Sequence, residues 1–120
     1  MIAGNWKMNG RHHSALALSQ DILSGLFANE SLLQLDWLIC PPYVHLHTVS
    51  EVLRSNRSSE IRLRFMLGAQ DLSVFDDGAF TGEISAEMLR DSDCASVLIG
   101  HSERRQHQDE SNDLIEKKLH

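Results

Sequence analysis

Short apolar runs alternate four times with stretches of helical spacing, and this alternation limits the fold more than any other feature of the sequence. The apolar runs are predicted strands and span residues 1–6, 35–40, 61–67 and 95–99. Regular alternation of strand and helix is typical of right-handed βαβ units, which build a parallel sheet. The sequence therefore predicts an α/β fold. Its periodicity is compatible with both a flavodoxin-like open sheet and part of a closed (β/α)8 barrel.

The segments between the predicted strands carry helix and turn signals. Apolar residues at three- and four-residue steps indicate a first amphipathic helix, with Ser14 as its N-cap. These residues are Ala15, Leu18, Ile22 and Leu26. Further helices are predicted over residues 46–53, 85–90 and 111–119, the last capped by Ser111. Residues 55–60 are predicted to be a polar connector and residues 71–82 a loop.

The charge of the chain excludes several classes of partner. The 120 residues carry a formal net charge of −6, and 42% of them are hydrophobic. Nucleic acid and anionic membranes need a basic face, so neither is an expected partner. No apolar run approaches the ~20 residues of a membrane span, and no secretory signal precedes the first predicted strand. We therefore expect a folded cytoplasmic protein.

Cysteine and histidine usage predicts neither a disulfide nor a metal site. Cys40 and Cys94 each lie in or beside a predicted strand, so we expect buried free thiols rather than a disulfide. The chain has seven histidines, but no group of Cys and His has the spacing of a closed zinc site. His45 and His47 lie near Cys40 but are predicted to point to different faces of a helix.

Polar side chains follow the first, third and fourth predicted strands, at the edge where parallel α/β folds bind ligands. Asn5 and Lys7 leave the first strand, and Gln70 leaves the third. His101 precedes a helical segment, whose positive N-terminus disfavours an imidazolium. A neutral imidazole there can donate a hydrogen bond to a developing oxyanion. Taken singly, Asn5, Lys7 and Gln70 are more typical of solvated polar groups in surface loops, whereas His101 is equally compatible with a surface residue and a site residue.

Three strings together carry more information than these residues do singly. They are Asn-Trp-Lys-Met-Asn-Gly at 5–10, Gly-Ala-Phe-Thr-Gly-Glu-Ile-Ser at 78–85 and Ile-Gly-His-Ser-Glu-Arg-Arg at 99–105. In this order and spacing they closely resemble the first half of the triosephosphate isomerase family. The resemblance implies the N-terminal half of a TIM (β/α)8 barrel, with residues 1–120 as one partial domain of about four β/α units. It also implies a cofactor-free aldose–ketose isomerase of glycolysis and gluconeogenesis, which interconverts dihydroxyacetone phosphate and D-glyceraldehyde 3-phosphate through an enediolate.

The resemblance also implies roles for individual residues. Asn5 and Lys7 would bind the triose phosphate, with Lys7 countering the charge of the phosphate and of the enediolate. His101 would be the neutral electrophile and, with Lys7, catalytic. Ser102 and Glu103 would support these two residues, Glu103 by pairing with Lys7. The family is homodimeric. The implied interface residues are Gln70, Thr81, Glu83 and Arg104, with Glu83 and Arg104 paired across the interface and Glu110 as a buried support.

The sequence departs from the family pattern in several ways. The family's catalytic glutamate, lid and late phosphate-binding loops belong to later strands, so these 120 residues are predicted to be inactive alone. Their four strands would leave open sheet edges and promote self-association. Two alternatives to the front half of an active isomerase remain, a non-catalytic remnant and a half-barrel that acts only by association. A barrel aldolase is disfavoured, because it needs a late Schiff-base lysine and lacks the His-Ser-Glu-Arg-Arg string. Asp71 stands where the family usually has Asn.

Overall fold

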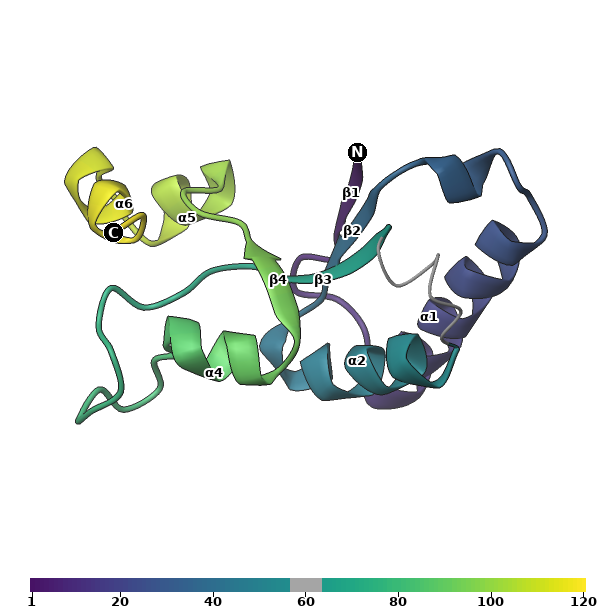
Figure 1. The fold of residues 1–120 in the computed structure, drawn as a ribbon. Coiled ribbons are helices and arrows are strands. Elements are labelled where there is room, and N and C mark those ends of the chain that lie inside the picture. Colours follow the sequence, from purple (N-terminus) through teal and green to yellow (C-terminus); the bar gives the residue numbers. More distant parts are fainter. Residues whose placement is uncertain (57–63) are drawn as a thin grey trace.

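The sheet has four parallel strands whose order in space is their order in the chain. The computed structural model describes residues 1–56 and 64–120. The strands are β1 (Ile2–Asn5), β2 (Trp37–Cys40), β3 (Phe65–Ala69) and β4 (Cys94–Val97). β1 pairs with β2, β2 with β3 and β3 with β4, so β1 and β4 are the two edges. The predicted α/β fold is confirmed, and the sheet is not closed (Figure 1).

Helices connect the strands, as a parallel sheet requires. The connecting helices are α1 (His12–Phe27), α2 (Leu46–Ser55) and α4 (Ala86–Asp91), with short 3-10 turns at Leu32–Gln34 and Tyr43–His45. Two more helices, α5 (Ser102–His107) and α6 (Asn112–Lys117), come after the last strand. α1 and α2 pack against each other, and α2 packs against β3. α5 and α6 follow β4 and lie beyond it, away from α1 and α2 (Figure 1). None of the described helices is long and apolar enough to span a bilayer.

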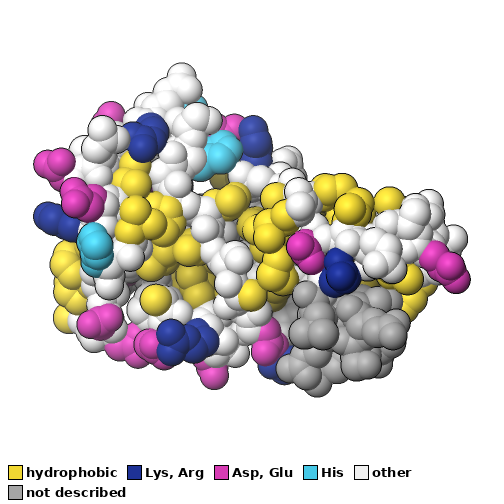
Figure 2. Space-filling view, turned by 45° about the horizontal axis from the view of Figure 1, so that its top comes forward, with side chains coloured by type: hydrophobic (Ala, Val, Ile, Leu, Met, Phe, Trp, Pro, Cys, Tyr) yellow, Lys and Arg dark blue, Asp and Glu magenta, His cyan; other side chains and the backbone are white. Residues whose placement is uncertain are grey.

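The hydrophobic core lies between the central strands and the helices α1, α2 and α4. Ile39 of β2 and Leu67 of β3 cluster with buried side chains from these helices, among them Leu23, Val49 and Leu89. Fully burying one such side chain stabilises the fold by about 1.5–3 kcal/mol. β2 and β3 are mostly buried, whereas β1 and β4 are half-buried or exposed. Apolar side chains are also exposed on the face drawn in Figure 2.

The first helix begins earlier than predicted. Its N-cap is Arg11 rather than Ser14, so that prediction is wrong. Ser14 lies inside the first turn, where its hydroxyl accepts from the Arg11 N–H at 2.8 Å and donates to the Arg11 carbonyl at 3.0 Å. The hydroxyl therefore satisfies the helix start from within the turn. The predicted cap of the last helix is confirmed, because the Ser111 hydroxyl accepts from the N–H of Leu114.

The last two strands differ from the prediction at their ends. Residues 61–63 of the third predicted strand lie outside the described residues, and β3 begins at Phe65. β4 ends at Val97, two residues before the predicted end at 99. Gly100 then has a φ of +66°, and a Cβ there would lie 2.7 Å from the Ile115 side chain. The backbone therefore leaves the sheet through a left-handed, tightly packed glycine.

The two thiols differ in burial. Cys40 is buried and Cys94 is half-buried, so the prediction of buried thiols is confirmed for Cys40 and only partly for Cys94. Burial raises the pKa of each thiol to about 11, and in Cys94 the nearby Cys40 adds to this effect. The reactive thiolate is therefore scarce near neutral pH.

Candidate active site

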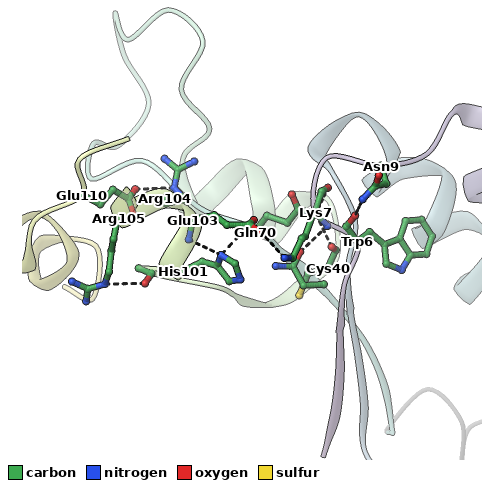
Figure 3. Close-up of polar contacts among 12 residues, drawn as sticks. Trp6, Lys7, Asn9, Cys40, Gln70, His101, Glu103, Arg104, Arg105 and Glu110 are labelled. Carbon is green, nitrogen blue, oxygen red and sulfur yellow. Dashed lines mark hydrogen bonds and ion pairs between the residues drawn. The ribbon is translucent and has the colours of Figure 1, made fainter. Parts of the chain in front are cut away.

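The polar side chains that follow β1, β3 and β4 meet at one edge of the sheet. Because the strands are parallel, their carboxyl ends lie together: Asn5 ends β1, Gln70 directly follows β3, and His101 follows β4. A pocket of about 360 Å³ lies at this edge. It is lined by Asn5, Lys7, Met8, Gln70, His101, Glu103, Arg104, His107 and Gln108. Figure 3 shows Lys7, Gln70, Glu103 and His101 as neighbours along this edge.

Lys7 has an unusual backbone conformation that its neighbours support. Its φ is +54°, in the left-handed region. This region costs an ordinary L-residue about 1–2 kcal/mol. The Lys7 N–H donates to Asn5 Oδ1 at 2.9 Å, and the Lys7 carbonyl accepts from Gln70 Nε2 at 2.9 Å. The backbone N–H and the backbone carbonyl of Lys7 are thus both held by hydrogen bonds. These bonds offset the strain and fix the direction in which the side chain leaves the backbone.

The Lys7 ammonium lies against the carboxylate of Glu103, at the first turn of α5. The distance from Lys7 Nζ to Glu103 Oε1 is 2.6 Å, and about half of each side chain is exposed. The hydrogen bond from Lys7 lowers the pKa of Glu103 and outweighs the opposing effect of desolvation. The structure therefore contains the Lys7–Glu103 pair that the sequence resemblance implies.

His101 is the N-cap of α5, and its ring accepts a hydrogen bond. The backbone N–H of Glu103 donates to His101 Nδ1 at 3.2 Å. A ring nitrogen that accepts carries no proton, so this bond assigns the proton of the neutral ring to Nε2. Glu103 Oε2 is also 3.7 Å from Nδ1, but this longer contact would need a protonated Nδ1. The shorter backbone hydrogen bond aligns with the first turn of the helix and therefore sets the orientation of the ring.

The residues implied at a subunit interface fall into two groups. Gln70 and Arg104 line the pocket and bond within the chain, Gln70 also to the Cys40 carbonyl at 2.8 Å. Thr81 and Glu83 lie outside the pocket lining, on the exposed part of the long loop after β3. This loop extends away from the sheet beside α4 (Figure 1). Ser102 begins α5 and also lies outside the pocket lining.

A network of four charged side chains adjoins the pocket through Arg104. Lys118 Nζ is 2.6 Å from both Asp71 Oδ1 and Glu110 Oε1. Arg104 reaches the same two residues, at 2.7 Å to Asp71 Oδ2 and 2.8 Å to Glu110 Oε1. Burial by itself raises the pKa of Glu110, but hydrogen bonds from Lys118 and Arg104 outweigh it and lower that pKa. The two cations and two carboxylates balance, so the network buries no net charge.

The sequence did not reveal that Asp71 and Lys118 belong to this network. In the sequence, Asp71 differs from the Asn that the family usually has, and nothing there pairs it with a cation. Lys118 caps the C-terminus of α6, four residues after Leu114 and three after Ile115, a spacing that aligns it with these two half-buried residues. That spacing was the available signal. Within the described part of the chain, no group of three His, Cys, Asp or Glu side chains is placed to hold a metal ion.

Comparison with known proteins connects this geometry to one family. A sequence model of triosephosphate isomerase matches residues 1–120. The triosephosphate isomerase of Shewanella amazonensis is 40% identical over 119 residues, and that of Shewanella woodyi is 42% identical. Each match covers 99% of this chain and 44% of the relative. The chain therefore spans somewhat less than half the length of these curated relatives.

A solved structure gives the same relationship in three dimensions. The crystal structure of triosephosphate isomerase from Bartonella henselae superposes with a TM-score of 0.78 at 33% sequence identity. The match covers 98% of this chain and 44% of that chain. The four parallel strands thus correspond to part of a TIM barrel. The chain belongs to the triosephosphate isomerase family.

Proposed function

We propose that the chain supplies the substrate-binding and electrophilic half of a triosephosphate isomerase active site, as the first four β/α units of the barrel. The complete enzyme would interconvert dihydroxyacetone phosphate and D-glyceraldehyde 3-phosphate. The convergence of Lys7 and His101 on one pocket carries this proposal. The ammonium group supplies a fixed positive charge and the imidazole supplies a neutral N–H donor. Together they fit a phosphorylated substrate on which an oxyanion develops.

The residues of the pocket divide the chemistry between them. The Asn5 amide and the Lys7 ammonium bind the substrate, and Lys7 stabilises the charge of the phosphate and of the enediolate. His101 donates from Nε2 to the carbonyl oxygen and moves a proton between the two oxygens. A neutral imidazole electrophile at a helix N-terminus is the arrangement already known for triosephosphate isomerases. Glu103 orients both groups, through its carboxylate and its backbone N–H, and Ser102 supports His101 at the start of α5.

The general base and the lid would come from the part of the family's length that this chain does not match. A general base contributes about 10²–10⁴-fold to such a reaction, and a lid that excludes water adds to it. We therefore infer that these 120 residues do not interconvert the two triose phosphates above a buffer blank. Robust turnover that scales with the concentration of the chain would contradict this inference.

A chimaera tests the proposal directly. The chain is joined to the remaining segment of the Shewanella amazonensis relative, and the isomerisation is followed with a coupled dehydrogenase assay. We expect activity in the folded chimaera, a large loss in Lys7→Met, and a loss of about 10²–10⁴-fold in His101→Gln. The control is Lys117→Met, which removes an exposed cation on α6. A folded chimaera without activity, or equal activity in all four proteins, would overturn the proposal.

A half-barrel that acts only by association is a second candidate. The observation in its favour is the open sheet, whose edge strands β1 and β4 are half-buried or exposed. Here the same two segments are produced separately and mixed. Activity that appears on mixing and saturates with the added segment supports this candidate. Activity only in the covalent chimaera rejects it.

We also propose that the complete protein is a cytoplasmic homodimer, with an interface that includes Gln70, Thr81, Glu83 and Arg104. The loop after β3 supports this, because Phe75 and Phe80 stack with ring centroids 4.0 Å apart while both remain substantially exposed. Such a loop presents a preformed apolar surface. Sedimentation equilibrium of the chimaera is expected to give a dimer, and Phe80→Ser should weaken it. A monomeric chimaera would reject the homodimer.

A further inference from the structure

The end of β3 contacts both halves of the pocket, although that strand carries neither Lys7 nor His101. Gln70 and Asp71 are consecutive residues at this end. They follow β3 at a bend, and their side chains contact different elements: Gln70 contacts the segments after β1 and β2, and Asp71 contacts Arg104 of α5. A single dipeptide can therefore reach toward β1 on one side and toward α5 on the other.

Gln70 reaches toward β1. Its Nε2 donates to the carbonyl of Lys7 at 2.9 Å and to the carbonyl of Cys40 at 2.8 Å. Cys40 ends β2 and pairs in register with Asn5 of β1. The amide of Gln70 therefore bridges the ends of β2 and β1, and holds the left-handed Lys7 from its carbonyl side (Figure 3).

Asp71 reaches toward α5. Its carboxylate lies 2.7 Å from Arg104 and 2.6 Å from Lys118, and its side chain is nearly buried. Arg104 is the neighbour of Glu103 in the first turn of α5. The backbone carbonyl of Asp71 accepts from the Tyr43 hydroxyl, which adds a tie to the segment after β2. Asp71 is thus anchored on both sides.

We propose that Gln70 and Asp71 are positioning residues that together set the approach of Lys7 to Glu103 and His101. In naming these groups as the two arms of a catalytic site, the proposal rests on the proposed function. Gln70 fixes the backbone from which the ammonium extends, and Asp71 fixes the helix turn that carries the carboxylate and the imidazole. In this proposal neither Gln70 nor Asp71 touches the reacting atoms of the substrate.

If Gln70 and Asp71 only stabilised the fold, their substitution would lower stability without changing the Lys7–Glu103 contact. Loss of a buried hydrogen bond or ion pair lowers the free energy of unfolding whether or not the pocket changes. A positioning role instead changes the Lys7–Glu103 contact in protein that is still folded. The carboxyl titration of Glu103 reports that contact, because the hydrogen bond from Lys7 is what lowers its pKa.

The test is a carbon-13 NMR titration of the Glu103 carboxyl in the 120-residue chain and its variants. Gln70→Met removes both amide donors at nearly constant length, and Asp71→Asn removes the carboxylate charge. Lys7→Met removes the donor itself and defines the full upward shift of the Glu103 titration. Asp76→Asn removes an exposed carboxylate from the same loop and is the matched control.

We expect Gln70→Met and Asp71→Asn to titrate between the unsubstituted chain and Lys7→Met, and Asp76→Asn to titrate like the unsubstituted chain. Asp71→Glu, which keeps the negative charge, should titrate closer to the unsubstituted chain than Asp71→Asn does. Unchanged Glu103 titrations in folded Gln70→Met and Asp71→Asn overturn the proposal. If only Asp71→Asn unfolds, Gln70→Met decides, because it leaves the buried charges in place. Unfolding of both variants also overturns the proposal, because the pair would then hold the fold rather than the pocket.

The experiment does not depend on catalysis or on a substrate. An inactive chimaera together with shifted Glu103 titrations would reject the proposed function and retain the positioning of Lys7. An active chimaera together with unshifted Glu103 titrations would retain the proposed function and reject the positioning of Lys7 by Gln70 and Asp71. The two failures are therefore distinguishable.

Discussion

Lys7 Nζ lies 2.6 Å from Glu103 Oε1 and joins the segment after β1 to the first turn of α5, across 96 residues of sequence. The two residues come from the first and the last of the four strand ends. Their contact therefore depends on every strand between them being in register. Because about half of each side chain is exposed, the pair orients the pocket more than it stabilises the fold.

The first prediction concerns the pH dependence of this pair. The pKa of Glu103 in the folded chain is below its ordinary value of 4.5, so the contact contributes above that value and is lost as the pH falls through the folded pKa. On the acid side, we expect the side-chain nitrogen resonance of Lys7 to move below the ordinary glutamate range, as Glu103 is protonated. The same titration of Glu103→Gln should show no such step. A Lys7 step near neutral pH would contradict the assignment.

The second prediction concerns the buried charges. Glu110→Gln leaves Lys118 and Arg104 with Asp71 as their only carboxylate in the network. Removing one partner of a buried ion pair costs about 3–5 kcal/mol, and we expect roughly 3 kcal/mol because Asp71 remains. Urea unfolding measures the loss. Glu116→Gln, which changes an exposed carboxylate on α6, should change the free energy of unfolding by less than about 0.5 kcal/mol.

The third prediction compares two glycines. A Cβ at Gly68 of β3 would lie 2.8 Å from Cys40 Sγ and 2.9 Å from a methyl of Leu38. Gly68→Ala is therefore expected to destabilise the chain by about 1–3 kcal/mol through overpacking. Gly25 lies in α1 with nothing within 4 Å of an added Cβ. Gly25→Ala should stabilise the chain by about 0.5–1 kcal/mol, because alanine loses less backbone entropy in a helix. Thermal unfolding of both variants checks the opposite signs.

The fold could be predicted from the sequence wherever the periodicity was strong. The apolar spacing of α1 and the runs at 35–40 and 95–99 gave elements that the structure confirms, with shifts at their ends. The start of α1 was misplaced because a serine one turn inside a helix can satisfy the same backbone groups as a serine at its N-cap. Local propensity does not distinguish these two positions.

The site was only partly predictable, for a different physical reason. Asn5, Lys7 and His101 follow strands, and the parallel order of the strands brings them to one edge. The network of Asp71, Arg104, Glu110 and Lys118 joins residues up to 47 positions apart through side-chain geometry. The periodic spacing of apolar residues, which predicts helices and strands, does not predict such contacts. The resemblance implies an interface role for Gln70, whereas its hydrogen bonds to the Lys7 and Cys40 carbonyls depend on how the strand ends meet in the folded chain.

The last prediction concerns the open edge of the sheet. β4 pairs with β3 on one side only, and the side chain of Ala95 on this strand is exposed. Unpaired edge strands recruit other chains, and an edge lysine blocks such pairing because its charge would have to be buried. We expect the 120-residue chain to self-associate in a concentration-dependent way, and Ala95→Lys to reduce that association in sedimentation velocity. Ala28→Lys, at the exposed C-cap of α1, adds the same charge away from the sheet. Both lysines bring the net charge of −6 closer to zero, which by itself promotes association. A decrease in Ala95→Lys alone therefore identifies the β4 edge as the contact, whereas equal behaviour of the two variants would place the contact elsewhere.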